Sequence, residues 1–243
     1  MDYILIIGAK SDIAKAIVKL FSKNSYNFYL AARNCHELTE FAEKTMFEND
    51  NAVKCIELDI LDTNKHADFY YSIKVKPLCV ISTIGYLGNQ KLAQIDFNET
   101  KKIIDTNFTS IISLLNIIVN DFEKKKKGTL IGISSVAGDR GKQSNYLYGA
   151  AKAAFTVYLS GLRARSFKSN INVITVKPGF VNTKMTHNLN LPKYLTTTPS
   201  KVALDIFKAF KNKQNIIYTS WIWKWIIFII NLIPENFYKK LKI

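Results

Sequence analysis

The feature that most constrains the fold of this chain is an alternation of short apolar runs with longer segments in which apolar residues recur every three or four positions. The short runs are predicted to form strands, at residues 3–7, 26–31, 53–58, 78–83, 129–134, 171–176 and 216–218. The longer segments are predicted to form helices, at residues 11–21, 37–47, 95–122 (one long helix or two joined) and 148–167. This spacing indicates right-handed βαβ units and a parallel sheet. The predicted fold class is therefore α/β: a single doubly wound domain with a parallel sheet flanked by helices, plus an apolar C-terminal helix.

No composition break, linker or internal repeat interrupts the chain before residue 215. We therefore expect one domain over residues 1–215, and a last strand with an apolar and basic helical extension over residues 216–243. The three cysteines, Cys35, Cys55 and Cys79, are scattered and show no C-x-x-C spacing. Neither a disulfide framework nor a zinc knuckle is expected from them, and no other residues have the spacing of metal ligands.

The charge balance of the chain is strongly basic, with 34 Lys and Arg against 19 Asp and Glu and a formal net charge of +15. Such a balance favours an anionic partner, which could be nucleic acid, a phosphorylated ligand or an acidic membrane face. No Arg-rich helix, aromatic RNA-binding motif or Cys/His finger is present, so no nucleic-acid partner is expected. The dense run at 124–127 is predicted to be a solvated loop. The apolar run 3–7 is too short for a signal peptide, which favours a reduced, cytoplasmic compartment.

A candidate phosphate-binding loop, residues 8–14 with the sequence GAKSDIA, lies between the first strand and the first helix. In a doubly wound fold the pyrophosphate of a nucleotide binds there, against the free N–H groups and the positive dipole end of the helix. Gly8 permits a tight turn and Lys10 adds a positive charge. The residues expected to border the phosphates are Gly8, Lys10, Ser11, Asp12 and Ile13.

The end of the second predicted strand distinguishes between two related cofactors. An acidic residue there would bind the ribose hydroxyls of NAD, but this chain has Ala32 followed by Arg33. The guanidinium of Arg33 suits the 2′-phosphate of NADP. The sequence therefore favours NADPH over NADH.

A tyrosine and a lysine, Tyr148 and Lys152, are four residues apart and so share one face of a predicted helix. An ammonium beside a phenol stabilises the phenolate and lowers the tyrosine pKa, which makes Tyr148 a usable acid or base for a carbonyl oxygen. Ser135 lies at the end of the fifth predicted strand, where a parallel sheet binds its ligand. Its hydroxyl is predicted to hold the substrate oxygen.

With these residues in this order, the chain resembles the short-chain dehydrogenase/reductase family over residues 1 to about 185. The resemblance implies a Rossmann-type, NAD(P)-binding catalytic domain in which hydride passes between nicotinamide and a carbonyl carbon. It makes Ser135, Tyr148 and Lys152 the catalytic residues, with Tyr148 and Lys152 also holding the cofactor, and Asn107 the residue that holds a water of the proton relay. It places Asp59 and Ile60 near the adenine. The nicotinamide end would be contacted by Pro178, Gly179, Val181 and Thr183. Two segments depart from the family pattern: only Gly8 remains of its three loop glycines, and Ser82-Thr-Ile-Gly85 replaces its N-N-A-G.

The loop at 8–14 and the C-terminal end together resemble a narrower group: the reductase subunit of decaprenylphosphoryl-ribose 2′-epimerase and related cell-surface polysaccharide reductases. This implies reduction of a ring ketone in a keto-sugar carried on a polyprenyl phosphate, after a partner oxidase has made the ketone. The alternatives are a soluble nucleotide-linked keto-sugar, a lipid ketone, or a non-catalytic NADP-binding scaffold. A homo-oligomer is also expected.

The C-terminal segment 221–233 is apolar apart from Lys224 and Asn231, and Pro234, Lys239, Lys240 and Lys242 follow it. Tryptophans at one end and lysines at the other suit a helix lying in a membrane interface, and a basic protein is attracted to anionic lipid. We expect peripheral contact with the inner face of the cytoplasmic membrane. A packing role in a dimer interface or over the substrate cleft is the alternative, and a spanning helix is the least favoured.

Overall fold

The computed structural model describes residues 1–241, and the sheet at its centre is parallel throughout. Within these residues the sheet has seven strands in the order β3-β2-β1-β4-β5-β6-β9. Their bounds are β1 Tyr3–Ile7, β2 Asn27–Ala32, β3 Val53–Glu57, β4 Cys79–Ser82, β5 Gly128–Ile133, β6 Ile171–Pro178 and β9 Ile216–Thr219. The predicted α/β class and parallel sheet are confirmed. β9, at the edge beside β6, belongs to the same sheet as the residues before 215.

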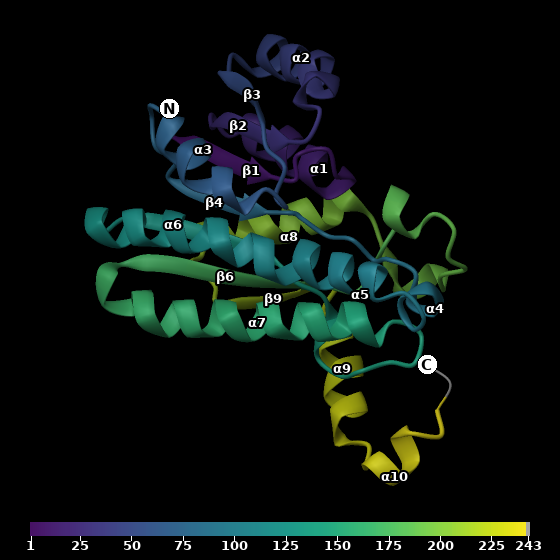
Figure 1. Ribbon diagram of the computed structural model, residues 1–243. Helices are drawn as coiled ribbons and strands as arrows, with labels where there is room; N and C mark the ends of the chain where they lie inside the picture. The colour runs from purple at the N-terminus through teal and green to yellow at the C-terminus, as the bar shows by residue number, and fades with distance from the viewer. Residues whose placement is uncertain (242–243) are drawn as a thin grey trace.

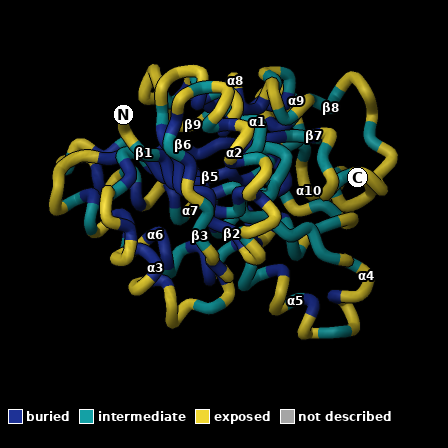
Figure 2. The backbone as a smooth tube through the Cα atoms, turned by 90° about the horizontal axis from the view of Figure 1, so that it is seen from above, coloured by how far each residue is buried: buried dark blue, intermediate teal, exposed yellow. Residues whose placement is uncertain are grey.

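The central strands are apolar on both faces because helices cover both sides of the sheet, as a parallel sheet requires. In β1, Ile4 and Ile6 face one hydrophobic cluster while Leu5 and Ile7 face the other. Figure 2 shows this core as a buried band through the middle of the molecule, with exposed loops around it. If β1 shifted by one residue relative to its neighbours, each of its side chains would move to the opposite face of the sheet. Because both faces are apolar, hydrophobicity alone does not fix the register of β1, and the neighbouring strands must do so.

Helices α1, α2 and α8 cover one face of the sheet, and α3, α6 and α7 cover the other, onto which Figure 1 looks. The bounds of the α-helices are α1 Asp12–Ser22, α2 Thr39–Asn49, α3 His66–Ser72, α4 Gln90–Ala93, α5 Phe97–Ile104, α6 Ser110–Lys125, α7 Tyr146–Ser166, α8 Pro199–Lys211, α9 Ile222–Leu232 and α10 Glu235–Tyr238. Short 3₁₀ turns occur at Cys35–Leu38, Thr63–Lys65, Val136–Gly138, Phe167–Ser169, Lys184–Thr186 and Lys193–Leu195.

Three of these helices, α3, α4 and α8, were not predicted. α8 has a clear sequence signal: Thr198 caps it by accepting a hydrogen bond from the N–H of Lys201 at 3.3 Å, and Pro199 occupies its first turn. Val202 and Ile206 then point into the core. α3 and α4 have seven and four residues, which is too short for periodicity to reveal.

The helix predicted over 95–122 is continuous from α5 through α6 but contains a π-helical turn at Asp105–Thr109. By length and apolar composition Phe97–Lys125 could cross a membrane, yet its apolar face packs in the core of the domain. The lysine run is not wholly a loop, because α6 continues to Lys125 and ends where Lys126 takes a left-handed φ of 51°. Cations are favoured at a helix C-terminus by its dipole, which explains the extension.

The C-terminal part of the chain leaves β9 and forms α9 and α10, which project from the body of the domain in Figure 1. Trp223 and Ile227 are the buried residues of α9 and pack against Phe180 and Val136. Phe180 belongs to a small second sheet in which β7, Phe180–Val181, pairs with β8, Thr196–Thr197. Lys242, one of the lysines expected at the membrane, lies outside the described residues.

Candidate active site

A cleft runs along the carboxyl edge of the sheet and consists of two cavities that share Lys10, Ser11, Thr83, Ile84 and Gly85. The first, of about 350 Å³, includes Ser135 and is called here the serine cavity. The second, of about 510 Å³, includes Arg33 and is called the arginine cavity. The shared residues follow β1 and β4, the adjacent strands from which the chain winds in opposite directions. This is the switch point at which doubly wound sheets bind nucleotides.

Gly8 makes the turn at the centre of the cleft. Its φ of +86° is strained for any residue with a side chain, and a Cβ there would lie 3.0 Å from Oγ1 of Thr83. The Thr83 hydroxyl lies 2.9 Å from the carbonyl oxygens of both Ile7 and Gly8, to either of which it can donate. Thr83, which was predicted to end a strand but not to have a role in the site, therefore joins the end of β4 to the turn.

The rest of the loop lines the cleft, but two of its charged side chains already have partners. Ser11 caps α1 by accepting a hydrogen bond from the N–H of Ala14 at 3.1 Å. The ammonium of Lys10 lies 2.7 Å from the Glu37 carboxylate, and the Asp12 carboxylate accepts a hydrogen bond from the N–H of Lys184 at 2.7 Å. Lys10 is thus partly neutralised, and Asp12 links the loop to the segment after β7. Ile13 lines the serine cavity.

The arginine cavity contains the residues predicted to hold the adenosine half of a dinucleotide. Arg33, Asp59 and Ile60 all line it, and Arg33 is exposed. Glu57 shapes the turn that carries Arg33, because its carboxylate accepts hydrogen bonds from the N–H groups of Asn34 and Cys35, both at 2.8 Å. Glu57 was not identified from the sequence as a functional residue.

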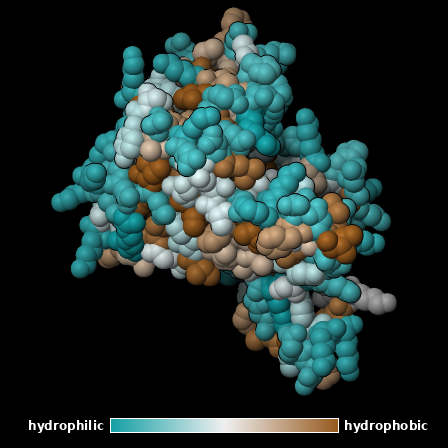
Figure 3. Space-filling view, viewed as in Figure 1, coloured by the Kyte–Doolittle hydropathy of each residue, from teal (hydrophilic) through white to brown (hydrophobic). Residues whose placement is uncertain are grey.

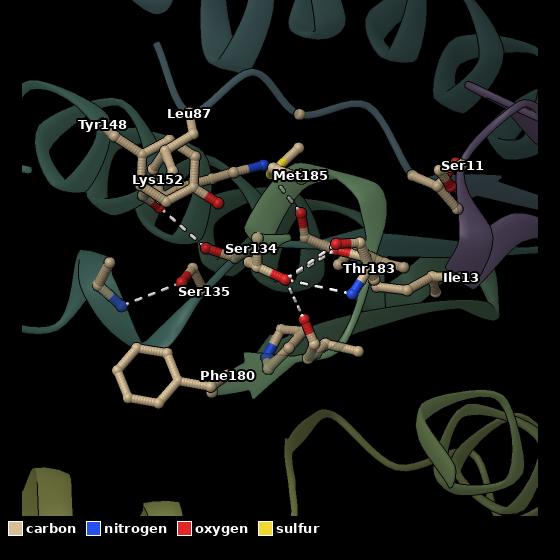
Figure 4. Close-up of a pocket in the computed structure, with 18 of the residues that line it drawn as sticks. Ser11, Ile13, Leu87, Ser134, Ser135, Tyr148, Lys152, Phe180, Thr183 and Met185 are labelled. Carbon is tan, nitrogen blue, oxygen red and sulfur yellow. Dashed lines mark hydrogen bonds between the residues drawn. The ribbon is translucent and has the colours of Figure 1, made fainter. Parts of the chain in front are cut away.

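Ser135 and Tyr148 lie on the same wall of the serine cavity, away from Ser11 and Ile13 (Figure 4). The Ser135 hydroxyl accepts a hydrogen bond from the N–H of Ala137 at 3.1 Å, which orients it at the end of β5. Burial raises the pKa of Tyr148 to about 12, and a hydrogen bond with Ser135 opposes this increase. Tyr148 is therefore protonated at neutral pH and can act as an acid.

Lys152 is 2% exposed and has no carboxylate partner among residues 1–241. Its ammonium donates to the carbonyl oxygens of Ile84 and Ile133, at 3.1 and 3.2 Å, and lies 5.8 Å from the centre of the Tyr148 ring. Burial lowers the pKa of Lys152 to about 7. The expectation that Lys152 would lower the Tyr148 pKa is thus not met in this structure, because desolvation dominates at both residues.

Asn107 lies in the π-helical turn of the long helix, and π-turns often occur at functional sites. Its side chain is fully buried and lines neither cavity. The amide nitrogen donates to the carbonyl oxygens of Tyr86 and Ile103, at 2.7 and 2.8 Å, and the amide oxygen accepts from the N–H of Tyr86 at 3.1 Å. The Asn107 side chain therefore positions the segment after β4 instead of facing the cavity.

The segment predicted to hold the nicotinamide end lines the serine cavity through Pro178, Gly179, Val181 and Thr183. Gly179 is required by packing, because a Cβ there would lie 1.9 Å from Nε1 of Trp223 on α9. The Trp223 indole donates to the carbonyl oxygen of Leu195 at 3.1 Å and meets the Phe180 ring edge-on at 5.1 Å. The C-terminal helix is thus part of the support of the cleft.

Several residues that line the serine cavity had no motif to reveal them. They are apolar, such as Leu87, Met185 and Leu189, or polar, such as Lys142 and Asn145. No sequence signal identifies them, because they come from loops whose course depends on the rest of the fold. Residues 1–241 contain no group of three or more His, Cys, Asp or Glu side chains placed to hold a metal ion.

The residues present fit a dinucleotide. The positive φ of Gly8 lets the backbone approach a pyrophosphate, and the N-terminus of α1 faces the cleft beside it. The two cavities extend from this point in opposite directions, one toward Arg33 and one toward Tyr148. Such a site, with a tyrosine, a serine and a lysine at one end, defines a nucleotide-dependent oxidoreductase acting on carbonyl or alcohol groups.

Comparison with known proteins agrees with this class. Residues 2–193 match the family model described as short chain dehydrogenase. The chain belongs to the short-chain dehydrogenase family and is an NAD(P)-dependent oxidoreductase. It is 27% identical to an uncharacterized oxidoreductase of Mycobacterium tuberculosis, over 98% of this chain and 96% of that protein. It is 24% identical to an uncharacterized oxidoreductase of Myxococcus xanthus, over 82% of this chain and 80% of the other.

Solved structures show the same fold at low sequence identity. A short-chain dehydrogenase from Sphingobium yanoikuyae in complex with NADPH superposes with a TM-score of 0.83, at 19% identity and 97% coverage of both chains. An alcohol dehydrogenase specific for bulky-bulky ketones, from Comamonas testosteroni, gives a TM-score of 0.81 at 19% identity, covering 97% of this chain and 96% of the other. None of these names includes a keto-sugar, so the narrower resemblance stays a prediction.

Proposed function

We propose that this protein is an NADPH-dependent reductase of a ketone. The observation that carries the proposal is one continuous cleft with Ser135, Tyr148 and Lys152 at one end and Arg33 at the other. The second strand ends in Ala32, so it offers no carboxylate to bind the ribose hydroxyls of NADH. A solved structure with a similar fold contains NADPH, which supports the same preference.

The residues of the chain have separate tasks in this reaction. A dinucleotide held in this cleft would supply the hydride that reduces the carbonyl carbon. Ser135 donates a hydrogen bond to the carbonyl oxygen, and protonated Tyr148 gives that oxygen its proton, so the product is an alcohol. Lys152, in its protonated ammonium form, stabilises the phenolate that remains on Tyr148. Because burial keeps Tyr148 protonated at neutral pH, its phenol can act as the proton donor in the reduction direction.

For the substrate, we propose a keto-sugar carried on a polyprenyl phosphate, made by a partner oxidase and reduced at the ring ketone. The serine cavity combines apolar walls, including Leu87, Met185 and Leu189, with the polar catalytic groups. An amphiphilic molecule fits this combination, and the net charge of +15 favours an anionic one. A soluble nucleotide-linked keto-sugar and a lipid ketone are the alternative substrates.

We further propose that α9 and α10 place the protein on the inner face of the cytoplasmic membrane. Their outward side exposes Trp221, Trp225, Phe228, Ile229, Leu232 and Phe237. Lys224, Lys239 and Lys240 are interleaved with these residues and are also exposed. The one carboxylate between 221 and 241, that of Glu235, is paired with Arg140 at 3.0 Å. Apolar and cationic side chains without free carboxylates suit an anionic lipid surface, and Figure 3 shows apolar and hydrophilic patches side by side on this projection.

The function is tested by measuring NADPH and NADH binding to the purified protein, then NADPH oxidation with a membrane lipid extract as substrate source. We expect at least tenfold tighter binding of NADPH, a smaller preference in Arg33→Ala, and lipid-dependent oxidation that Tyr148→Phe abolishes. Lys168→Ala, at an exposed residue outside the cleft, is the matched control for Arg33→Ala. Turnover of water-soluble keto-sugars alone would reject the lipid-linked substrate. Binding of neither nucleotide would reject both the reductase and the NADP-binding scaffold, whereas NADPH binding without Tyr148-dependent oxidation would favour the scaffold.

A further inference from the structure

The loop between Ser135 and Tyr148 places two polar side chains in the serine cavity that the reaction does not use. They are Lys142 and Asn145. Both precede α7, whose first turn carries Tyr148, so the fold fixes them close in the chain to the group that protonates the substrate. A substrate whose ketone reaches Tyr148 occupies the same cavity as these two side chains.

The ammonium of Lys142 has no carboxylate or hydrogen-bond acceptor as partner among residues 1–241. It lies over the indole ring of Trp223, 5.9 Å from the ring centre, a favourable but weak contact for a cation. Lys142 is half-buried, and this burial lowers its pKa. An isolated cation in a cavity is costly unless an anion joins it.

Other lysines of the region contrast with Lys142. Lys10 is paired with Glu37, Lys152 donates to two carbonyl oxygens, and Lys177 is paired with Asp139. Lys184 also lines the serine cavity without an ion pair, but its backbone N–H donates to Asp12, which places it beside the phosphate loop. Lys142 therefore differs from Lys10, Lys152 and Lys177 in having neither an ion pair nor a hydrogen-bond acceptor for its ammonium within the described residues, and it differs from Lys184 in its position.

Asn145 adds a second unsatisfied group. Its side-chain oxygen is buried and has no hydrogen-bond partner in the described chain. Buried polar atoms without partners are rare, and each one needs a partner such as a water, an ion or a bound molecule. A hydroxyl group of a ligand would donate to this oxygen.

The position of Lys142 separates it from the cofactor phosphates. Its contact residue Trp223 packs against Phe180, and Phe180 lies on the side of the cavity with Ser135, opposite Ser11 (Figure 4). The pyrophosphate binds at the N-terminus of α1, on the Ser11 side. An anion at Lys142 therefore belongs to the substrate.

We propose that Lys142 and Asn145 form a substrate subsite, in which Lys142 binds a phosphate group and Asn145 accepts a hydrogen bond from a hydroxyl group of the same molecule. The substrate class is then a hydroxylated ketone esterified to phosphate. This rests on the proposed reductase function and specifies which part of the substrate the chain recognises. The phosphate could belong to a soluble sugar phosphate or to a prenyl phosphate.

The test is binding calorimetry on the protein loaded with NADP⁺, with ribulose 5-phosphate and ribulose as one pair of probes and farnesyl phosphate and farnesol as the other. We expect the phosphorylated member of at least one pair to bind at least tenfold more tightly than its partner. Lys142→Met should remove this difference and Lys142→Arg should retain it. Which pair shows the difference tells whether the phosphate is soluble or lipid-borne.

Lys127→Met is the matched control, because it removes the same charge at an exposed residue just before β5, whereas the cleft lies after the opposite end of that strand. Asn145→Leu should weaken the binding of ribulose 5-phosphate several-fold. The affinity for farnesyl phosphate should not change, since this molecule has no sugar hydroxyl. Equal affinity within both pairs, or a phosphate preference that survives Lys142→Met, overturns the subsite.

The failure of the subsite and of the proposed function can be told apart. Lys142→Met should leave the NADPH dissociation constant unchanged, since Lys142 lies away from the phosphate loop. If NADPH binds and Tyr148-dependent oxidation occurs without any phosphate preference, the subsite is wrong and the reductase stands. If NADPH does not bind, the reductase is wrong whatever the probes show.

Discussion

At the scale of single residues, burial without an opposite charge nearby shifts the pKa values of Lys152 and Tyr148. Desolvation disfavours the charged form of each, so it lowers the pKa of the lysine and raises that of the tyrosine. The chain holds the Lys152 ammonium with carbonyl oxygens, which orient it without compensating its charge. This arrangement has a cost in stability that depends on pH.

We expect the free energy of unfolding of the cofactor-free protein to rise with pH between about 7 and about 10.5. In this range Lys152 is largely neutral in the folded state but still binds a proton in the unfolded state, whose lysine pKa is the ordinary 10.5. The unfolded state then holds more protons, and the contribution of this residue approaches about 1.4 kcal/mol per pH unit. Urea denaturation at a series of pH values measures this dependence of the free energy of unfolding on pH.

Lys152→Met is the diagnostic variant, because it should remove this rise while abolishing turnover. Lys168→Met, at an exposed residue, should keep both the slope and the activity. An unchanged slope in Lys152→Met would show that other groups dominate the pH dependence.

The residues predicted to be catalytic, Ser135, Tyr148 and Lys152, lie together in one cavity, whereas most of the other residues that line this cavity were not predicted. Ser135, Tyr148 and Lys152 follow a strand end and a helical spacing, which are local features. Asn107 was predicted only from the family resemblance, and its side chain is used entirely in hydrogen bonds with backbone groups. Lys142 acquires its meaning only from Trp223, some eighty positions later, and no local pattern contains that contact.

At the scale of the secondary-structure elements, the sheet was predictable because each strand carries its own apolar run. The missed helix α8 shows the limit of reading periodicity alone, since its capping threonine and first-turn proline were visible in the sequence. The π-turn at Asp105–Thr109 was not visible in the sequence; it contains Asn107, whose side chain makes three hydrogen bonds with Tyr86 and Ile103. Elements fixed by distant partners cannot be read from their own residues.

The contact of α9 with the segment after β6 depends on a glycine. In Gly179→Ala the added Cβ would overlap Trp223, and we expect a loss of about 1–3 kcal/mol in the free energy of unfolding, as for overpacked cores. A double-mutant cycle with Trp223→Ala measures the coupling. The cost of Gly179→Ala should fall in the Trp223→Ala background, because the clashing ring is absent. If Gly179→Ala costs the same free energy with and without Trp223, the added Cβ is accommodated by other groups and not by the Trp223 ring.

The end of α9 is held by one side chain from the active-site loop. Arg140 donates to the carbonyl oxygens of Ile230 and Ile233, pairs with Glu235 and stacks on the ring of Tyr238 at 3.6 Å. The Tyr238 hydroxyl in turn donates to the carbonyl oxygen of Gly141 at 2.7 Å. The loop that carries Lys142 is thereby joined to the C-terminal helices at both Arg140 and Gly141.

At the scale of the whole molecule, the proposed membrane contact depends on the net charge and on the projecting α9–α10 pair. We expect co-sedimentation with phosphatidylglycerol vesicles but not with phosphatidylcholine vesicles, and weakening as salt rises, because the screening length falls from ~10 Å at 0.1 M to ~3 Å at 1 M. The double variant Trp225→Ser and Phe228→Ser should bind at least tenfold more weakly.

Phe47→Ser with Phe167→Ser is the control for that variant, since both phenylalanines are exposed and lie outside α9 and α10. Analytical ultracentrifugation tests the alternative, in which the exposed side of α9 forms a dimer interface. If the wild-type protein ignores anionic vesicles and forms a dimer that the Trp225 and Phe228 variant dissociates, the exposed side of α9 is a contact between subunits and not a membrane surface.

The packing of Trp223 on Gly179 and Phe180 also affects how the protein is made. Synthesis proceeds from the N-terminus, and early parts of a chain begin to fold before later parts have emerged. The phosphate loop and the strands up to β6 can therefore assemble while the residues around 223 are still inside the ribosome. The packing of Trp223 on Gly179 and Phe180 is completed only afterwards, so a chain cut short before α9 would lack the ring that lies beneath Lys142.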